Sequence, residues 1–321
     1  MQPIFSIIIP AYNLSSIVCC AINSCLSQTG ISHAEYEIIV INDGSTDDTT
    51  TYLEKYRNNP RIQIVDQQNS GLSGARNRGI SLSSGQYILF LDGDDWLEKN
   101  ALHILKQEIE NDTLIIFPLN YVWPNGKESI SQFNLIDKHH YTRNQLLKQT
   151  LGYSQFNIIP AQAKLYPASI LKTSNINFIH GILHEDNPFF AEVCKGYTKF
   201  KFINEKIYNY RQQREGSITS AQSIRNFTGT IKGIKQIEQI FQNSNSDINF
   251  LISNLFVFQA ILKYNDGAEK YIFHYLRNGR IKLHLLKLLF SSRFRYKHFI
   301  RHCLLIIDPK LLRKVLHILY G

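Results

Sequence analysis

Residues 87–96 read Tyr-Ile-Leu-Phe-Leu-Asp-Gly-Asp-Asp-Trp, and this stretch decides how the N-terminal half is expected to fold. Five apolar or aromatic residues are followed within four positions by Asp92, Asp94 and Asp95. Strands of a parallel sheet are continuously apolar because helices cover both of their faces. In such α/β folds, ligands bind just beyond the carboxyl ends of the strands. We therefore expect a buried strand at Tyr87–Leu91 that delivers three carboxylates to the edge of a mostly parallel sheet.

These carboxylates have two interpretations. Asp92 and Asp94 are one residue apart and could face the same hard divalent cation, which prefers oxygen ligands and can bridge them to a diphosphate. The alternative is an acidic turn in which Asp95 is the N-cap of a helix from Leu97 to Gln107. The stretch by itself favours neither, so the surrounding sequence has to decide.

Short apolar runs alternate with helical stretches over residues 1–120. The expected strands are Phe5–Pro10, Tyr36–Ile41, Arg61–Val65, Tyr87–Leu91 and Thr113–Phe117, and the expected helices are Leu14–Ser27, Thr46–Arg57 and Leu72–Ser83. This alternation is typical of a parallel sheet with right-handed crossover connections. The fold class expected is thus α/β, with a Rossmann-like sheet.

The pattern changes twice further along the chain. Between about residues 120 and 215 we expect a turn at Pro124–Gly126 and strands at Ser129–Ile136, Lys199–Ile203 and Lys206–Arg211. After residue 222 the sequence predicts helices almost exclusively, at Ser223–Gln242, Asp247–Lys263 and Ala268–Arg277, followed by a basic helical tail. We therefore expect two domains, residues 1–218 and a helical extension at residues 219–321.

Composition describes an ordered globular protein. The chain has 321 residues, 44% of them hydrophobic, with 19 Phe and 17 Tyr. Its five cysteines are odd in number and lack zinc-site spacing, which favours a reduced cytoplasmic compartment. The first strand has no basic stretch before it, and no uncharged apolar run reaches the roughly 18 residues that span a bilayer. We expect neither a signal peptide nor a transmembrane helix, but a soluble or peripheral protein.

The formal net charge of +9 is concentrated at the C-terminal end. Residues 281–321 carry nine Lys or Arg against the single acid Asp308, with apolar residues interleaved at helical spacing. Such a segment suits the surface of an anionic membrane, where each basic residue contributes about 1 kcal/mol. The alternative is a helical cap with one core face and one solvated face. No nucleic-acid motif accompanies the charge, so nucleic acid is not an expected partner.

Two turns at the ends of predicted strands could bind a nucleotide. Pro10, Ala11, Tyr12 and Asn13 end the first strand, and the Tyr12 ring there could stack on a base. At the end of the next strand, Asp43 could accept a hydrogen bond from a nucleobase N–H. Its neighbour Gly44 permits close approach. The alternative for Asp43 is an N-terminal helix cap.

Charged residues further along offer the remaining chemistry. Arg76, among small residues at the start of a helix, suits a diphosphate at the positive end of that helix. Asp186, after Glu185, could be a general base that takes the proton of an attacking hydroxyl, or alternatively a helix cap. Arg211 and Arg214 could neutralise a leaving diphosphate, or alternatively be surface charges.

The order and spacing of these motifs resemble one family. The chain is similar to family 2 glycosyltransferases of the GT-A fold, the bacterial type that builds surface polysaccharides. The resemblance covers about residues 4–218. The residues that carry it are Ser6–Asn13, Ile41–Asp47, Gly74–Gly79, Asp92–Asp95 and Glu185–Asp186.

The resemblance implies roles for particular residues. Pro10, Ala11, Tyr12, Asn13, Asp43 and Gly44 would line the base, with Asp43 on a uracil. In the acidic DxD element Asp92 would face the ribose, with Gly93 beside it, and Asp94 would meet Mn²⁺ or Mg²⁺, a role that Asp95 could take instead. Asp186 would be the catalytic base. Arg211 and Arg214 align only loosely with the arginines of the family, and Lys164 receives no role, its alternative being a surface lysine.

The resemblance also implies a reaction. An inverting enzyme would move a sugar from a UDP-sugar to a hydroxyl of a glycan, in capsule, lipopolysaccharide or related synthesis. The acceptor would be a growing lipid-linked glycan at the cytoplasmic face of the inner membrane. Galactose, glucose and their N-acetylated forms all stay open as the transferred sugar. A sugar-nucleotide pyrophosphorylase would need a glycine-rich, lysine-containing loop where this chain has Ala11–Leu14. The third interpretation is a non-catalytic nucleotide-sugar binder or membrane scaffold, and the intact set of Asp43, Asp92, Asp94 and Asp186 argues against it.

Overall fold

The computed structural model describes residues 2–131, 133, 135–146, 159–182 and 185–213, together with Gln236 and Gln239. The chain divides into two compact units, Met1–Ser217 and Ile218–Gly321. The division falls one residue before the boundary expected from the sequence. Apart from Gln236 and Gln239, the helices predicted after residue 222 and the basic tail lie outside the described residues. The fold below is that of the first unit.

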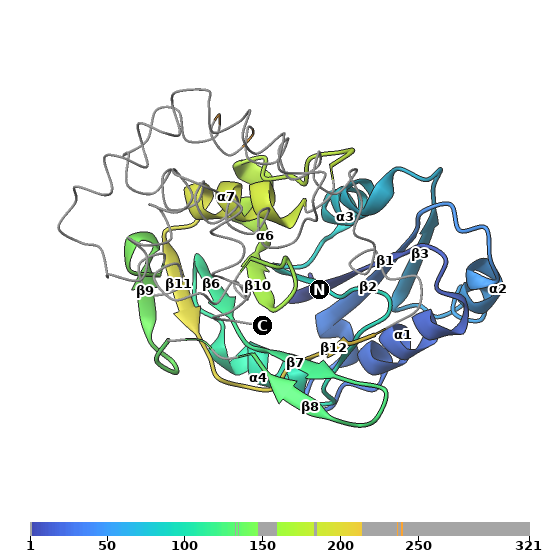
Figure 1. Cartoon of the computed structure of the whole chain (residues 1–321), viewed down its shortest axis with the longest axis horizontal. Coiled ribbons are helices and arrows are strands. Elements are labelled where there is room, and N and C mark those ends of the chain that lie inside the picture. Colours follow the sequence, from blue (N-terminus) through green and yellow to red (C-terminus); the bar gives the residue numbers. More distant parts are fainter. Residues whose placement is uncertain are drawn as a thin grey trace, which may run out of the picture. The chain divides into compact units, whose positions relative to one another are not determined.

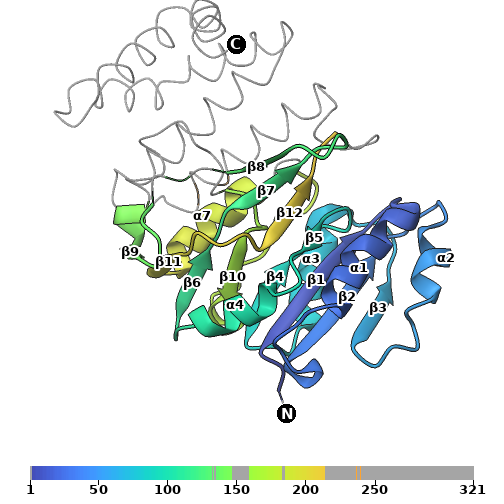
Figure 2. The ribbon, with the colours of Figure 1, turned by 90° about the horizontal axis from the view of Figure 1, so that it is seen from below.

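Within the described residues, eight strands form one sheet in the order β3-β2-β1-β4-β10-β6-β11-β9 (Figures 1 and 2). They are β1 (Phe5–Ala11), β2 (Tyr36–Asn42), β3 (Ile62–Asp66), β4 (Tyr87–Phe90), β6 (Thr113–Ile116), β9 (His140–Thr142), β10 (Lys164–Pro167) and β11 (Lys199–Phe202). β1 to β4 pair in parallel, as do β6 and β11. β10 runs antiparallel to both β4 and β6, and β9 runs antiparallel to β11. The sheet is mostly parallel, and the predicted α/β class is confirmed.

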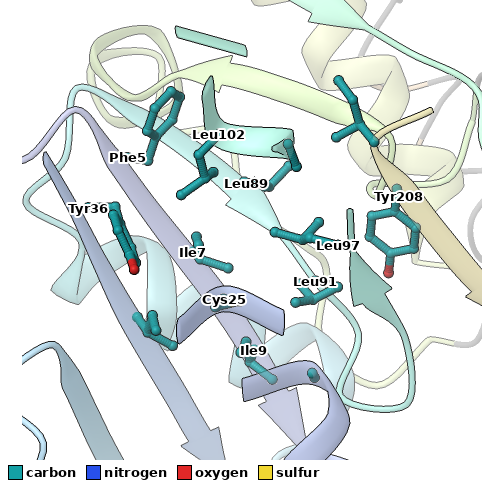
Figure 3. Close-up of a cluster of buried hydrophobic side chains, with 14 of the residues drawn as sticks. Phe5, Ile7, Ile9, Cys25, Tyr36, Leu89, Leu91, Leu97, Leu102 and Tyr208 are labelled. Atoms are coloured by element: carbon teal, nitrogen blue, oxygen red, sulfur yellow. The ribbon is translucent and has the colours of Figure 1, made fainter. Parts of the chain in front are cut away.

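Helices cover both faces of this sheet, which is why its central strands β1, β2 and β4 are almost entirely buried (Figure 1). One face carries α1 (Val18–Leu26), α2 (Thr49–Glu54) and α4 (Ala101–Glu108), and the other carries α3 (Gly71–Leu82), α6 (Ala168–Thr173) and α7 (Asp186–Gly196). Two short 3₁₀ turns, η1 (Ser15–Ile17) and η2 (His33–Glu35), lie in the connections. Successive side chains of β1 serve different faces. Ile7 and Ile9 join Leu89, Leu91 and Cys25 in the cluster of Figure 3. Ile8, on the opposite side, packs under Gly79 of α3.

The described residues also form a second, smaller sheet of four strands, in the order β5-β12-β7-β8. Its strands are β5 (Trp96–Leu97), β12 (Tyr208–Arg211), β7 (Leu119–Val122) and β8 (Glu128–Ile130). The predicted turn joins β7 to β8, with Gly126 at φ +78° and its N–H donating to Trp123 O at 2.9 Å. The strand predicted at Ser129–Ile136 is shorter and earlier than expected. Because β12 pairs with β5, Tyr208 and Arg211 lie beside the turn after β4.

The structure excludes two of the helix-cap alternatives. α4 begins at Ala101 with Asn100 as its N-cap, because Trp96 and Leu97 form the short strand β5 instead of helix. Asp95 therefore caps no helix. Likewise α2 starts only at Thr49, with Asp48 at its N-cap position, so Asp43 is not a cap either. In the described part of the chain, no helix combines the length and the apolar character that a membrane crossing requires.

Candidate active site

The parallel pairing of β1 with β2 and β4 gathers three polar turns at one edge of the sheet. The turn at residues 12–13 follows β1, Asp43 follows β2, and the acidic stretch at residues 92–95 follows β4. Hydrogen bonds between the strands continue into these turns, since Asp43 N donates to Ala11 O at 2.9 Å. This edge is where the sequence places most of its candidate residues.

The turn after β1 leaves one aromatic ring accessible. Asn13 has a positive φ of 50°, and its Oδ1 accepts the Thr46 N–H at 2.8 Å, which ties the turn to the loop after β2. Tyr12 is 48% exposed, so its ring is available for stacking. Pro10 and Ala11 are buried inside β1 and present backbone rather than side chains at the edge.

Asp43 is held by the start of α3. Its Oδ1 accepts hydrogen bonds from Gln67 Nε2 at 2.7 Å and from Ser70 N at 2.9 Å. A nucleobase contact therefore has to use Oδ2. Gly44 has φ +71°, and a Cβ there would lie 2.8 Å from Asn69 N, so the loop packs closely against this position. Both features fix the direction of the Asp43 side chain.

Arg76, from α3, lies at the centre of the acidic residues. Its side chain is only 1% exposed. Nη2 contacts Asp92 Oδ1, and Nη1 contacts both Glu185 Oε1 and Asp186 Oδ1, each at 2.9 Å. Burial acts to lower the pKa of Arg76, but the surrounding acids, Asp92 first, raise it above its ordinary value. Arg76 thus joins three acids from two parts of the chain, and its predicted contact with a diphosphate stays a prediction.

Asp186 and Glu185 stand at the start of α7, yet Glu185, the N-cap residue, makes no capping hydrogen bond through its side chain. Burial raises the pKa of Glu185 to about 7, and the neighbouring Asp186 charge adds to this while Arg76 opposes it. The pKa of Asp186 is also raised, first by burial, against the effect of Arg76. The Asp186 side chain keeps 25% of its surface exposed. Asp186 is therefore an accessible carboxylate with a stronger affinity for protons than a free aspartate.

The three acids after β4 have different surroundings. Asp92 uses Oδ1 for Arg76 and accepts the Gln162 amide on Oδ2. Asp95 is 1% exposed, and its two oxygens accept Tyr208 OH at 2.7 Å and Arg211 N at 2.8 Å. Burial, and then the Asp94 and Asp92 charges, hold the pKa of Asp95 well above its usual range. These contacts give Asp95 the role of anchoring β12 to the acidic turn.

Comparison with known proteins assigns the chain to a family. Residues 6–172, more than half of the sequence, match the profile of Glycosyl transferase family 2. The chain belongs to this family. Four of the five motifs that suggested the resemblance, from Ser6 to Asp95, lie within the matched region, and the fifth, Glu185–Asp186, lies beyond it.

Individual relatives extend the comparison. The glycosyltransferase GlyA of Streptococcus pneumoniae serotype 4 is 31% identical over 222 residues, covering 67% of this chain and 31% of GlyA. The hyaluronan synthase of Pasteurella multocida is 40% identical over 243 residues, covering 65% of this chain and 24% of the synthase. The chain thus spans less than a third of either relative. The crystal structure of S. aureus TarS 1-349 in complex with UDP-GlcNAc matches with a TM-score of 0.72 at 19% identity, covering 98% of this chain and 91% of that one. This likeness confirms the GT-A fold.

Of the two arginines predicted near the acidic turn, the structure describes Arg211. Arg211 Nε donates to Asp94 O at 2.7 Å, and the guanidinium lies 5.0 Å from the centre of the Trp96 ring. Arg211 is therefore fixed beside the turn after β4. Gly93, between the acids, faces the end of β1, where an added Cβ would lie 2.8 Å from Pro10 O. Arg214 lies outside the described residues.

The predicted metal site stays a prediction. Among the residues that the structure describes, no group of three or more His, Cys, Asp or Glu side chains is arranged to hold a metal ion. Asp94 is partly exposed in the turn after β4. The carboxylates on either side of it, Asp92 and Asp95, are engaged by other protein groups.

Sequence reasoning gave Lys164 no role and did not identify Gln162. Lys164 is 1% exposed, so its interpretation as a surface lysine is wrong. Its Nζ donates to Pro160 O and lies 3.5 Å from Gln162 O, and burial lowers the pKa of Lys164 to about 7. Gln162, 4% exposed, contacts Asp92 directly. A lysine inside the apolar run Ala163–Tyr166 was the available signal, because charged residues are rarely buried without a specific partner.

Proposed function

We propose that this chain is an inverting glycosyltransferase that moves a sugar from a UDP-sugar to a hydroxyl group of a glycan acceptor in surface-polysaccharide synthesis. The observation that carries the proposal is the set of contacts from Arg76 to Asp92 and Asp186, which brings a donor-side acid and a candidate base to one guanidinium. Membership of family 2 supports it. Two relatives, a hyaluronan synthase and TarS in complex with UDP-GlcNAc, support a UDP-sugar as donor and a glycan as acceptor.

On the donor side, the nucleotide would occupy the edge beyond β1 and β2. The exposed Tyr12 ring would stack on the base, and Asp43 Oδ2 would accept a base N–H. Asp92 would lie on the ribose side. Arg211, packed on Trp96 beside the acidic turn, would help to neutralise the leaving diphosphate.

Asp186 would be the general base. An attacking hydroxyl must lose its proton as the new bond forms, and a carboxylate within hydrogen-bond reach can accept it. A free aspartate has a pKa near 3.9, so the raised pKa of Asp186 makes it a better proton acceptor in this site. Attack on the side of the sugar opposite the leaving group inverts the anomeric centre.

Asp94 is the residue that we propose to hold Mn²⁺ or Mg²⁺. Such ions are often bound through one or two carboxylates together with substrate phosphates, so a single partly exposed acid fits this chemistry. When bound, the ion would stabilise the charge that grows on the leaving diphosphate. Asp94→Asn should abolish the dependence of UDP affinity on Mn²⁺, as measured by titration calorimetry with and without EDTA. An unchanged Mn²⁺ dependence would assign the ion to another residue.

The acceptor that we propose is a lipid-linked glycan at the cytoplasmic face of the membrane. The basic segment at residues 281–321 supports peripheral attachment, because anionic lipids attract clustered Lys and Arg. Sedimentation of the full chain with phosphatidylglycerol vesicles, compared with neutral phosphatidylcholine vesicles, tests this location.

The decisive experiment replaces Asp186 by Asn. A panel of UDP-sugars with Mn²⁺ first identifies the donor through UDP release in the presence of oligosaccharide acceptors. Asp186→Asn should then reduce transfer by at least a hundredfold while UDP affinity changes by no more than about twofold, because the loss of a general base typically costs 10²–10⁴-fold. Glu192→Gln makes the same charge change on α7 and should retain activity. Near-normal transfer by Asp186→Asn would show that Asp186 is not the general base. If the wild type released no UDP with any donor, the chain would instead be a non-catalytic binder.

A further inference from the structure

Residues 159–163, which precede β10, reach both acids of the proposed mechanism. The Gln162 side-chain amide donates to Asp92 Oδ2, and the Ala161 backbone makes a hydrogen bond to Asp186. The segment is buried, with Ala161 fully enclosed and Gln162 only 4% exposed. It therefore lies between the donor-side acid and the candidate base.

Side chains of β10 hold this segment in place through three consecutive carbonyl groups. Lys164 Nζ contacts Pro160 O and Gln162 O, and Tyr166 OH donates to Ala161 O at 2.9 Å. Fixing three carbonyls in succession leaves the backbone little freedom. The position of the Gln162 side chain is thus set by β10 and by Asp92 together.

One atom of this side chain is left without a partner. Among the described residues, Gln162 Oε1 is buried and accepts no hydrogen bond. Exchanging the amide oxygen and nitrogen would not relieve this, since it would point Oε1 at the Asp92 carboxylate. A buried acceptor without a partner is costly, and in a native protein it calls for a ligand or water that supplies a donor.

We propose that Gln162 binds a hydroxyl group of one of the two reacting sugars through Oε1, a role that rests on the function proposed above. Oε1 can only accept, so the ligand group must be a donor, which excludes a phosphate oxygen. The side chain contacts Asp92 and its backbone neighbour contacts Asp186, so the group that it meets belongs where the donor sugar and the attacking hydroxyl come together. Both sugars carry hydroxyl groups, and the test separates them.

The test combines Gln162→Met with substrates that lack single hydroxyl groups. Titration calorimetry measures the affinity of UDP, of the donor identified above and of its monodeoxy analogues. Steady-state kinetics measures kcat/KM for the acceptor and for its monodeoxy analogues. In the wild type, deleting the bound hydroxyl should reduce affinity or kcat/KM about five- to tenfold. In Gln162→Met, the intact substrate should show that loss already, and the matching deoxy analogue should show none in addition.

The deoxy analogues to which Gln162→Met is insensitive identify the sugar that Gln162 contacts. They also separate a direct contact with the sugar from an effect that acts through Asp92. Loss in the donor series with UDP affinity unchanged assigns the contact to the transferred sugar, and loss in the acceptor series assigns it to the acceptor. Equal sensitivity of wild type and variant to every deoxy analogue would overturn the proposal, because Gln162 would then act only through Asp92. Gln28→Met is the matched control, since this buried glutamine bonds Glu98 O and Leu102 N outside the site. A wild type that binds no UDP-sugar would overturn the proposed function itself, and this inference with it.

Discussion

Replacing Arg76 by Met tests whether one guanidinium keeps three acids together. The side chain is 1% exposed and contacts Asp92, Glu185 and Asp186 at 2.9 Å each. Methionine has a similar length and fits an apolar surrounding, so the change removes the charge with little change in volume. Removing one partner from a buried ion pair typically costs about 3–5 kcal/mol, because the remaining charges lose their compensation. We expect a loss of that size in the free energy of unfolding at pH 8.

The loss should shrink as the pH falls. The pKa of Glu185 is already raised to about 7 in the presence of Arg76, and it should rise further in the variant. An acid whose pKa is raised by folding stabilises the fold below its unfolded pKa, and this contribution is lost as the pH rises through its folded pKa. Each additional proton held by the folded variant offsets about 1.4 kcal/mol per pH unit. Wild-type Glu185 takes up the same proton below about pH 7, so between pH 8 and pH 6 one such proton should reduce the loss by up to about 1.4 kcal/mol.

Urea denaturation followed by tryptophan fluorescence measures both quantities. The chain has two tryptophans, Trp96 and Trp123, and both lie in the first unit, so the signal reports the unit that contains Arg76. Arg57→Met is the control, because Arg57 pairs with Glu54 and Asp66 in a more exposed setting, where an ion pair contributes about 1 kcal/mol or less. A loss below about 1 kcal/mol for Arg76→Met at pH 8, or an equal loss at pH 6 and pH 8, would refute this account of the acids.

Two further predictions use the same denaturation assay. Folding lowers the pKa of Lys164 from 10.5 to about 7, so above pH 7 the unfolded chain holds a proton that the folded chain lacks. The stability of the wild type should therefore rise relative to that of Lys164→Met by about 2 kcal/mol between pH 7.5 and pH 9.0. A difference in stability that does not change with pH would show that Lys164 keeps its proton. Tyr208→Phe removes the hydroxyl that donates to Asp95 and accepts from Asp92 N. This change should lower the free energy of unfolding by about 1–3 kcal/mol. A loss within experimental error would contradict the anchoring of β12 by Asp95.

The parallel half of the fold could be predicted from the sequence because each element there is locally consistent. β1, β2 and β4 are mainly apolar runs bounded by turns, so both the strands and the edge that they share follow from local patterns. β10 could not be predicted in this way. It has four residues, one of them Lys164, and its place between β4 and β6 depends on antiparallel pairing with strands far away in the sequence.

The same distinction between local pattern and tertiary packing applies to the residues of the site. Asp43, Asp92 and Asp94 were identifiable because acids that directly follow parallel strands meet at one edge. The partners of these acids were not, since Arg76 and Asp186 are 110 residues apart and Tyr208 is 113 residues from Asp95. Sequence motifs thus located the acids, whereas tertiary packing determines what each acid contacts.

The contacts of Arg76 bear on how a diphosphate could be bound at all. Its charge is already opposed by three carboxylates, so the group of four residues presents a negative surrounding to a negative ligand. A nucleoside diphosphate would be repelled there unless positive charge came from another source. Arg211, fixed against Trp96, is one such source, and a divalent ion on Asp94 would be another. If both proposals hold, loss of the ion should weaken UDP far more than loss of the Arg211 charge, because a divalent cation between phosphates is the larger local charge.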